Sequence, residues 1–138
     1  MAVSHQGVFT QLPKITPVAF VNADASTKKT IHTAGADGSK INNVIATSTD
    51  TSDRIIQLWL TRSSTAHLLG SVTVKAGAGT DGVTPTQNLL TAALITLAVD
   101  NDGQPYLFLE SGDTLQASST TTITTAKTVE VVAQGANF

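Results

Sequence analysis

Residues 31–61 have the sequence Ile-His-Thr-Ala-Gly-Ala-Asp-Gly-Ser-Lys-Ile-Asn-Asn-Val-Ile-Ala-Thr-Ser-Thr-Asp-Thr-Ser-Asp-Arg-Ile-Ile-Gln-Leu-Trp-Leu-Thr. This pattern predicts three β-strands, at 29–33, 40–47 and 54–61, joined by a glycine-containing turn and by a polar Thr-Asp turn. In the third strand, apolar Leu58 and Leu60 alternate with Gln57 and Trp59, which indicates a strand with one buried face. We therefore place Leu58 and Leu60 in the core, and Trp59 at the edge of the core or on a contact surface.

The middle strand of this stretch carries an irregularity. Ile41 and Val44 are three residues apart, whereas residues on one face of a strand are separated by two. A β-bulge at Asn42-Asn43 would return both apolar side chains to the same face.

Outward from this stretch, the same criteria predict further short strands at 18–21, 68–75, 95–99, 106–110, 114–118 and 127–133. In 68–75 the alternation groups Leu68 with Val72 and Val74 on one face. Thr84-Pro85 resembles a helix start, and apolar residues at helical spacing after it predict one short helix at about 86–94. These eight or nine short strands and one short helix favour an all-β fold, a sandwich or a barrel.

The first 17 residues show no strand or helix period. Pro13 and Pro17 remove backbone donors, so we expect residues 1–17 to form an extended N-terminal arm and residues 18–138 to form a single β-sandwich domain. The arm carries apolar side chains without an evident place in the core, which typically marks a partner surface. The predicted partner contacts are Val8, Phe9, Leu12, Ile15 and Trp59.

Composition limits the classes of function. The chain has 138 residues, no Cys, 13% charged residues and a net charge of −2, which disfavours disulfides, thiolate metal sites and direct nucleic-acid binding. Its longest apolar stretch, Ala92 to Val99, is far shorter than the ~20 residues of a membrane-spanning helix. We expect no signal peptide, because a charged start and an apolar segment are missing.

Two glycine-containing segments match the letters of ligand-binding motifs. Gly77 to Gly82 has the spacing of a dinucleotide fingerprint, but no helix follows it directly, so we expect a flexible surface loop. Asp100-Asn-Asp-Gly resembles the start of a calcium loop, but it lacks a closing Glu, so we expect a hairpin turn.

The remaining candidates for chemistry are scattered. His5, His32 and His67 are far apart in the sequence, and Ser63-Ser64 lacks the flanking glycines of a nucleophile elbow. We therefore expect no enzymatic activity, no cofactor and no metal site.

Three longer patterns resemble one family of proteins. They are Thr33-Ala-Gly-Ala-Asp-Gly-Ser-Lys-Ile followed by Val44-Ile-Ala-Thr-Ser-Thr-Asp-Thr and the strand from Arg54 to Leu60; Asn88-Leu-Leu-Thr-Ala-Ala-Leu followed by Asp102-Gly-Gln-Pro-Tyr-Leu-Phe-Leu; and Leu109-Glu-Ser-Gly-Asp-Thr-Leu-Gln-Ala followed by Val129-Glu-Val-Val. These patterns, which span about residues 30–133, resemble the decoration or cement proteins of tailed-phage capsids, most closely those of Bordetella-type short-tailed phages.

The resemblance implies a jelly-roll-like β-sandwich that binds the outer surface of a phage capsid and cements neighbouring capsomers against internal DNA pressure. The implied partners are the major capsid protein and further copies of the chain, as a dimer or alternatively a trimer, with no membrane and no direct nucleic-acid contact. The implied location is the outer capsid surface of the virion, after synthesis in the host bacterial cytoplasm. Two alternatives are a carbohydrate- or receptor-binding module of a phage fibre, and a minor head–tail structural protein.

Overall fold

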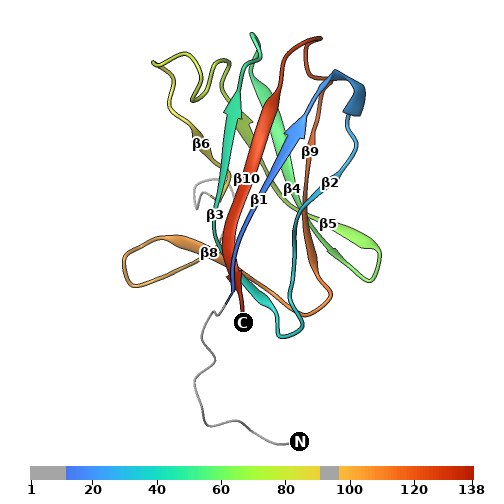
Figure 1. Cartoon of the computed structure of the whole chain (residues 1–138), viewed down its shortest axis with the longest axis vertical. Helices are drawn as coiled ribbons and strands as arrows, with labels where there is room; N and C mark the ends of the chain where they lie inside the picture. The colour runs from blue at the N-terminus through green and yellow to red at the C-terminus, as the bar shows by residue number, and fades with distance from the viewer. Residues whose placement is uncertain (1–11, 91–96) are drawn as a thin grey trace, which may run out of the picture.

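Two antiparallel sheets pack face to face as a β-sandwich in the computed structural model, which describes residues 12–90 and 97–138 (Figure 1). The strands are β1 (Leu12–Phe20), β2 (Lys29–Thr33), β3 (Ser39–Ser48), β4 (Arg54–Arg62), β5 (Thr65–Val74), β6 (Gln87–Asn88), β7 (Ala98–Val99), β8 (Pro105–Leu109), β9 (Thr114–Ser119) and β10 (Val129–Asn137). The six-stranded sheet has the order β1-β10-β3-β8-β7, with β6 beside β3, and the four-stranded sheet has the order β2-β9-β4-β5. A short 3-10 helix, η1 (Asn22–Asp24), follows β1.

The core lies between the two sheets and is built by alternating side chains. Ile56 and Leu58 of β4 are fully buried, whereas Ile55 on the opposite face is 42% exposed. Leu60 is partly buried and packs against the same core. The predicted core assignment of β4 is therefore confirmed, and so is the all-β class.

The predicted bulge in β3 is also confirmed. In the pairing of β10 with β3, Gln134 lies opposite Asn43 and Gly135 lies opposite Ile41, so Asn42 is the extra residue. The bulge keeps both Ile41 and Val44 fully buried. Gly135 faces this irregularity, and a Cβ there would collide with the Lys40 carbonyl, which explains why the position carries glycine.

The predicted helix at 86–94 is wrong for the residues that the structure describes. Gln87–Asn88 forms β6, which pairs with β3, and Leu89 and Leu90 are buried in the core. The Leu89 N–H donates to the Val44 carbonyl and the Leu90 N–H donates to the Asn88 side chain, so these donors do not enter helical bonds. Residues 91–94 lie outside the described residues, and the described part of the chain contains no α-helix.

The predicted N-terminal arm is wrong for residues 12–17, which belong to β1 and pair continuously with β10. Pro13 and Pro17 are tolerated because β1 is an edge strand of its sheet, where a backbone N–H that would point to solvent can be missing. Residues 1–11, with the rest of the predicted arm, lie outside the described residues.

A second bulge changes the predicted face of β5. Trp59 pairs with Leu68 and Leu58 pairs with Gly70, so Leu69 is the extra residue. Leu68 is consequently 50% exposed, and Leu69 packs against the core instead. The predicted grouping of Leu68 with Val72 and Val74 is therefore wrong, because the bulge reverses the alternation within the strand.

Candidate interaction surfaces

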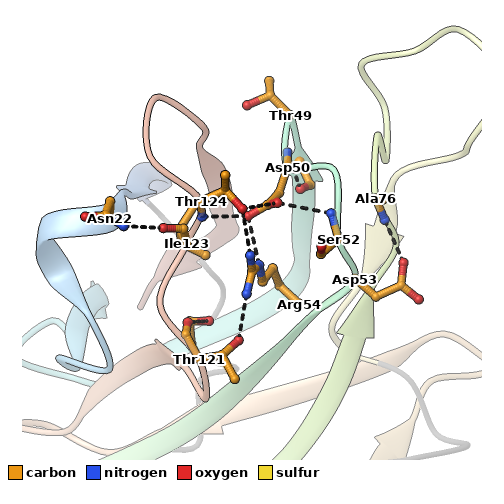
Figure 2. A network of polar contacts seen from close by, with 12 residues as sticks. Asn22, Thr49, Asp50, Ser52, Asp53, Arg54, Ala76, Thr121, Ile123 and Thr124 are labelled. Atoms are coloured by element: carbon orange, nitrogen blue, oxygen red, sulfur yellow. Dashed lines mark hydrogen bonds and ion pairs between the residues drawn. The ribbon is translucent and has the colours of Figure 1, made fainter.

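The most buried charge of the described residues is Asp50, in the turn between β3 and β4 (Figure 2). Its carboxylate accepts four hydrogen bonds, from Arg54 Nε at 2.8 Å, Ser52 N at 3.1 Å, Thr124 N at 3.0 Å and Thr124 Oγ1 at 2.8 Å. The Asp50 carbonyl accepts a further bond from the Gly77 N–H. Asp50 therefore ties together three loops at one end of the sandwich.

Two opposed effects act on the pKa of Asp50. Burial raises the pKa of this carboxyl, but the hydrogen bonds from Arg54, Thr124 and Ser52 outweigh burial and hold the pKa well below its usual range. Asp50 is thus charged throughout the neutral pH range and acts as a structural anchor, which is the opposite of what a general acid or base working near neutral pH requires.

A second Asp–Arg ion pair lies at the other end of β4. Arg62 is the last residue of β4, and it donates from Nε and Nη2 to the two carboxylate oxygens of Asp113 at 2.7 and 2.6 Å. Asp113 is 1% exposed, and its pKa is lowered by the bonds from Arg62 and from the Glu110 N–H, despite burial. The first and last residues of β4, Arg54 and Arg62, are each held by a buried carboxylate.

The glycine-containing motifs are structural in the described chain. Gly103 has a φ of 76°, and Asp100 Oδ1 accepts the Asp102 and Gln104 N–H groups, so the predicted hairpin turn is confirmed. The loop at Gly77 to Gly82 is more tightly anchored than the predicted flexible loop, because the Ala78 carbonyl accepts the Ser48 N–H and Thr80 Oγ1 donates to the Ser48 carbonyl.

Ser63 and Ser64 both have positive φ and form the hairpin turn between β4 and β5.

Among the described residues, no three His, Asp or Glu side chains converge as a metal-binding group. No helix in this part of the chain is long and apolar enough to span a membrane.

One pocket of about 280 Å³ lies between the edge strands β1 and β2 and is lined by Lys14, Thr16, Thr30, His32 and Thr33. His32 is 2% exposed, and its Nε2 atom has no hydrogen-bond partner among the described residues. The lining offers one ammonium group, three hydroxyls and an imidazole but no carboxylate. The pocket can hold a small polar group, but its described lining contains no carboxylate that would orient His32 as a catalytic base.

His32 gives a testable pH dependence. Burial, together with the nearby Lys14 ammonium, lowers the pKa of His32 below its usual value of about 6.5. The unfolded chain therefore takes up a proton before the folded chain as the pH falls, and stability declines below about pH 6.5 until the folded pKa is passed.

Between about pH 7 and pH 5.5, we expect His32→Gln to lose less unfolding free energy than the wild type. The dependence of unfolding free energy on pH should differ between the two proteins by up to about 1.4 kcal/mol per pH unit. Urea melts at both pH values measure it. The same pH dependence in both proteins would show that His32 is not the titrating group.

The outer face of the six-stranded sheet is broad and weakly charged. In the row of register partners that crosses its middle, Pro17 pairs with Val132 and Val132 pairs with Ile45. Next to this row lies Ile15, opposite Gln134 and 68% exposed. No described element covers this face, whose outward strand positions carry only two charged residues, Lys40 and Glu130.

An aromatic cluster extends this face at the end where β1 begins and β10 ends. Tyr106 and Phe108 lie edge to face with ring centroids 5.1 Å apart, and Phe138 lies 5.9 Å from Phe108. The Lys40 ammonium lies 4.8 Å from the centre of the Tyr106 ring. Phe108 is 57% exposed, so the cluster offers apolar surface to a partner.

The outer face of the four-stranded sheet has a different character. Trp59 lies there half-buried, donates from Nε1 to Ser118 Oγ at 2.9 Å and carries the Lys28 ammonium 4.3 Å from its ring centre. Beside it, Thr61 Oγ1 donates to Gln116 Oε1, and Gln116 Nε2 donates to Thr30 Oγ1. This face combines one indole with hydroxyl and amide groups.

The predicted contact residues do not form one surface. Ile15 lies on the outer face of the six-stranded sheet, and Trp59 lies on the outer face of the four-stranded sheet. Leu12, 60% exposed, begins β1 on the side that faces the other sheet, and Val8 and Phe9 lie outside the described residues. The predictions missed the aromatic cluster, although the alternation of Tyr106 and Phe108 with Leu107 and Leu109 would have indicated an apolar outer face.

Searches against protein families and against curated proteins found no match for this chain.

Proposed function

We propose that this protein is a structural virion protein that binds the outer surface of a tailed-phage capsid and cements neighbouring capsomers. The observation that carries the proposal is that the described sandwich has two candidate partner surfaces on opposite sides, the weakly charged outer face of the six-stranded sheet with exposed Ile15 and the outer face of the four-stranded sheet with Trp59, because a protein that joins neighbouring subunits needs more than one contact surface. The buried carboxylates Asp50 and Asp113 are fully engaged in structural bonds, which supports a role in binding rather than in chemistry.

We further propose that the sandwich is a jelly roll. With the two-residue strands β6 and β7 set aside, the sheets have the orders β1-β10-β3-β8 and β2-β9-β4-β5. In a jelly roll of eight strands, the first strand lies beside the last and the second beside the one before the last, and the same holds here. Jelly rolls are common among viral capsid proteins and lectins, which supports a virion role by analogy of fold.

Shell binding tests the proposal directly. Shells assembled from the major capsid protein of the same phage genome would be mixed with the purified chain, pelleted and heated. We expect the chain to pellet with the shells and to raise the temperature at which they break. A chain that stays in the supernatant and leaves shell stability unchanged would contradict the proposed function.

Matched variants locate the contact. We expect Leu12→Asp to weaken shell binding about tenfold, equivalent to about 1.4 kcal/mol, because it places a charge at a predicted contact. Val83, 88% exposed, lies in a loop outside the predicted contacts, and Val83→Asp serves as the control. Equal losses in both variants would show that the effect of Leu12→Asp is not a local contact.

Trp59 supports a second candidate, a carbohydrate-binding module of a phage fibre. Glycan sites combine an aromatic ring with hydrogen-bonding groups, and Trp59 lies beside Ser118 and near Gln116. Since Trp59 is the only Trp of the chain, its fluorescence reports on this face alone. A saturable fluorescence change with purified host lipopolysaccharide, lost in Trp59→Phe, would favour this candidate over the cement role.

A further inference from the structure

No described element covers the outer face of the six-stranded sheet, and the free edge of β1 limits how a partner can approach it. Pro13 and Pro17 lie four residues apart in β1, opposite Ala136 and Val132. In an antiparallel ladder, positions four apart direct their backbone groups to the same side, and proline cannot donate to the neighbouring strand. Both prolines therefore remove N–H groups from the free edge of β1, which disfavours the addition of another strand there. A partner is expected on the face of the sheet instead.

The two charges of this face lie at its opposite ends. Lys40 of β3 pairs with Ala136, and Glu130 of β10 pairs with Thr47. About six residues of β10 separate the two levels, which corresponds to roughly 20 Å along the strands. Neither residue forms an ion pair with another described residue.

Four rows of register partners run from one charged residue to the other, and they can be paired symmetrically about the middle of the face. On β10 and β3, the order of rows is Ala136 with Lys40, Gln134 with Asn43, Val132 with Ile45, and Glu130 with Thr47. Consider two copies that face each other through this surface. A two-fold axis in the plane between them, perpendicular to the strands and midway along the four rows, places the first row of one copy opposite the fourth row of the other. The same axis places the second row opposite the third. It keeps β10 over β10 and β3 over β3, so Lys40 of each copy meets the end that carries Glu130 of the other.

We propose that this face binds a second copy of the same chain, with the strands of the two copies antiparallel. The apolar centre of the contact comes from Ile15, Val132 and Ile45, and each end carries one Lys40–Glu130 pair between the copies. Two-fold contacts are self-complementary, and this face supplies both members of each charge pair.

This contact would join two copies of the proposed cement protein, and the role of the dimer in bridging capsomers rests on that proposed function. A dimer through this face leaves both four-stranded sheets, with Trp59, directed away from the contact. Each dimer would then present two identical surfaces to neighbouring capsomers, and two linked contacts bind more tightly than one. The dimer itself is tested on the isolated protein, without shells.

Charge reversal is the sharpest experiment, with sedimentation equilibrium of the purified chain as the measurement. We expect Lys40→Glu and Glu130→Lys each to weaken the dimer about tenfold to a hundredfold, because each change places two like-charged pairs in the symmetric contact. The double variant Lys40→Glu/Glu130→Lys should return to within about threefold of the wild-type dissociation constant, since the pairs are restored with exchanged signs. Lys28→Glu, on the other side of the sandwich beside Trp59, is the matched control and should leave the dimer unchanged.

The outcomes separate cleanly. Rescue in the double variant supports the proposed face and orientation. A wild-type chain that stays monomeric at all concentrations overturns the proposed dimer but leaves shell binding to its own test. If the wild type dimerises but the single reversals do not weaken the dimer, the antiparallel arrangement on this face is overturned. The same holds if the single reversals weaken the dimer and the double variant does not regain the wild-type affinity. Circular dichroism of each variant checks that the exposed substitutions leave the fold intact.

Discussion

Asp50→Asn is expected to lower the free energy of unfolding by about 3–5 kcal/mol, the usual cost of breaking a buried ion pair. The Asp50 side chain is fully buried, and the Arg54 side chain beside it is 13% exposed. Each carboxylate oxygen of Asp50 accepts two donors, and an amide nitrogen in either position would face two donors without accepting either. Urea-induced unfolding at neutral pH measures the loss.

Asp53→Asn is the matched control in the same turn. Asp53 also accepts two bonds, from Lys75 and from the Ala76 N–H, but its side chain is 46% exposed. Solvent screens such a pair, so the variant should lose far less free energy of unfolding than Asp50→Asn. Losses of similar size in both variants would contradict the structural role assigned to Asp50.

The Asp50 effect also has a defined pH dependence. The folded pKa of Asp50 lies below its unfolded value of about 3.9, so the unfolded chain takes up the proton first as the pH falls. The stabilisation is present above about pH 4 and is lost progressively below it. The difference between wild type and Asp50→Asn should therefore shrink in melts at strongly acidic pH and should be constant between pH 5 and 7.

Leu58→Ala is expected to lower the free energy of unfolding by about 2–5 kcal/mol, because it removes apolar atoms and leaves a cavity in the core. Leu58 is fully buried at the centre of β4, where it pairs with Ala117 of β9 and Gly70 of β5. Neither neighbour has a side chain large enough to fill the space.

Gln57→Ala provides the control, since Gln57 is the preceding residue of β4 and lies on the outer face of the sheet. It should cost about 0.5 kcal/mol or less. If Gln57→Ala destabilised the protein as much as Leu58→Ala, the assignment of inner and outer faces of β4 would be contradicted.

Local features of the sequence allowed most strands to be predicted. Period-two alternation in residues 54–61 identified β4 and its buried side, because a strand directs successive side chains to opposite faces. The three-residue spacing of Ile41 and Val44 identified the bulge in β3, and Asp-Gly predicted the turn before β8. Each of these signals depends only on residues that are neighbours in the chain.

Predictions failed where distant segments decide the structure. Leu89 and Leu90 have helical spacing with the residues after them, but β3 accepts the Leu89 N–H as a sheet partner. Pro13 and Pro17 suggested an arm, yet pairing with β10, more than a hundred residues later in the chain, makes this segment an edge strand. In both segments, backbone bonds to a distant strand outweigh local preference.

The sequence by itself determined the all-β class and the inner face of β4. Only the tertiary structure decided how the surfaces and charges are grouped. Asp50 meets Thr124, and Phe108 meets Phe138, because β10 returns beside β3 and brings the C-terminal residues to elements formed much earlier in the chain. The alternation of a strand specifies which side chains share a face, whereas the order of strands in the sheet specifies which faces combine into a surface, and that order depends on packing of the whole chain.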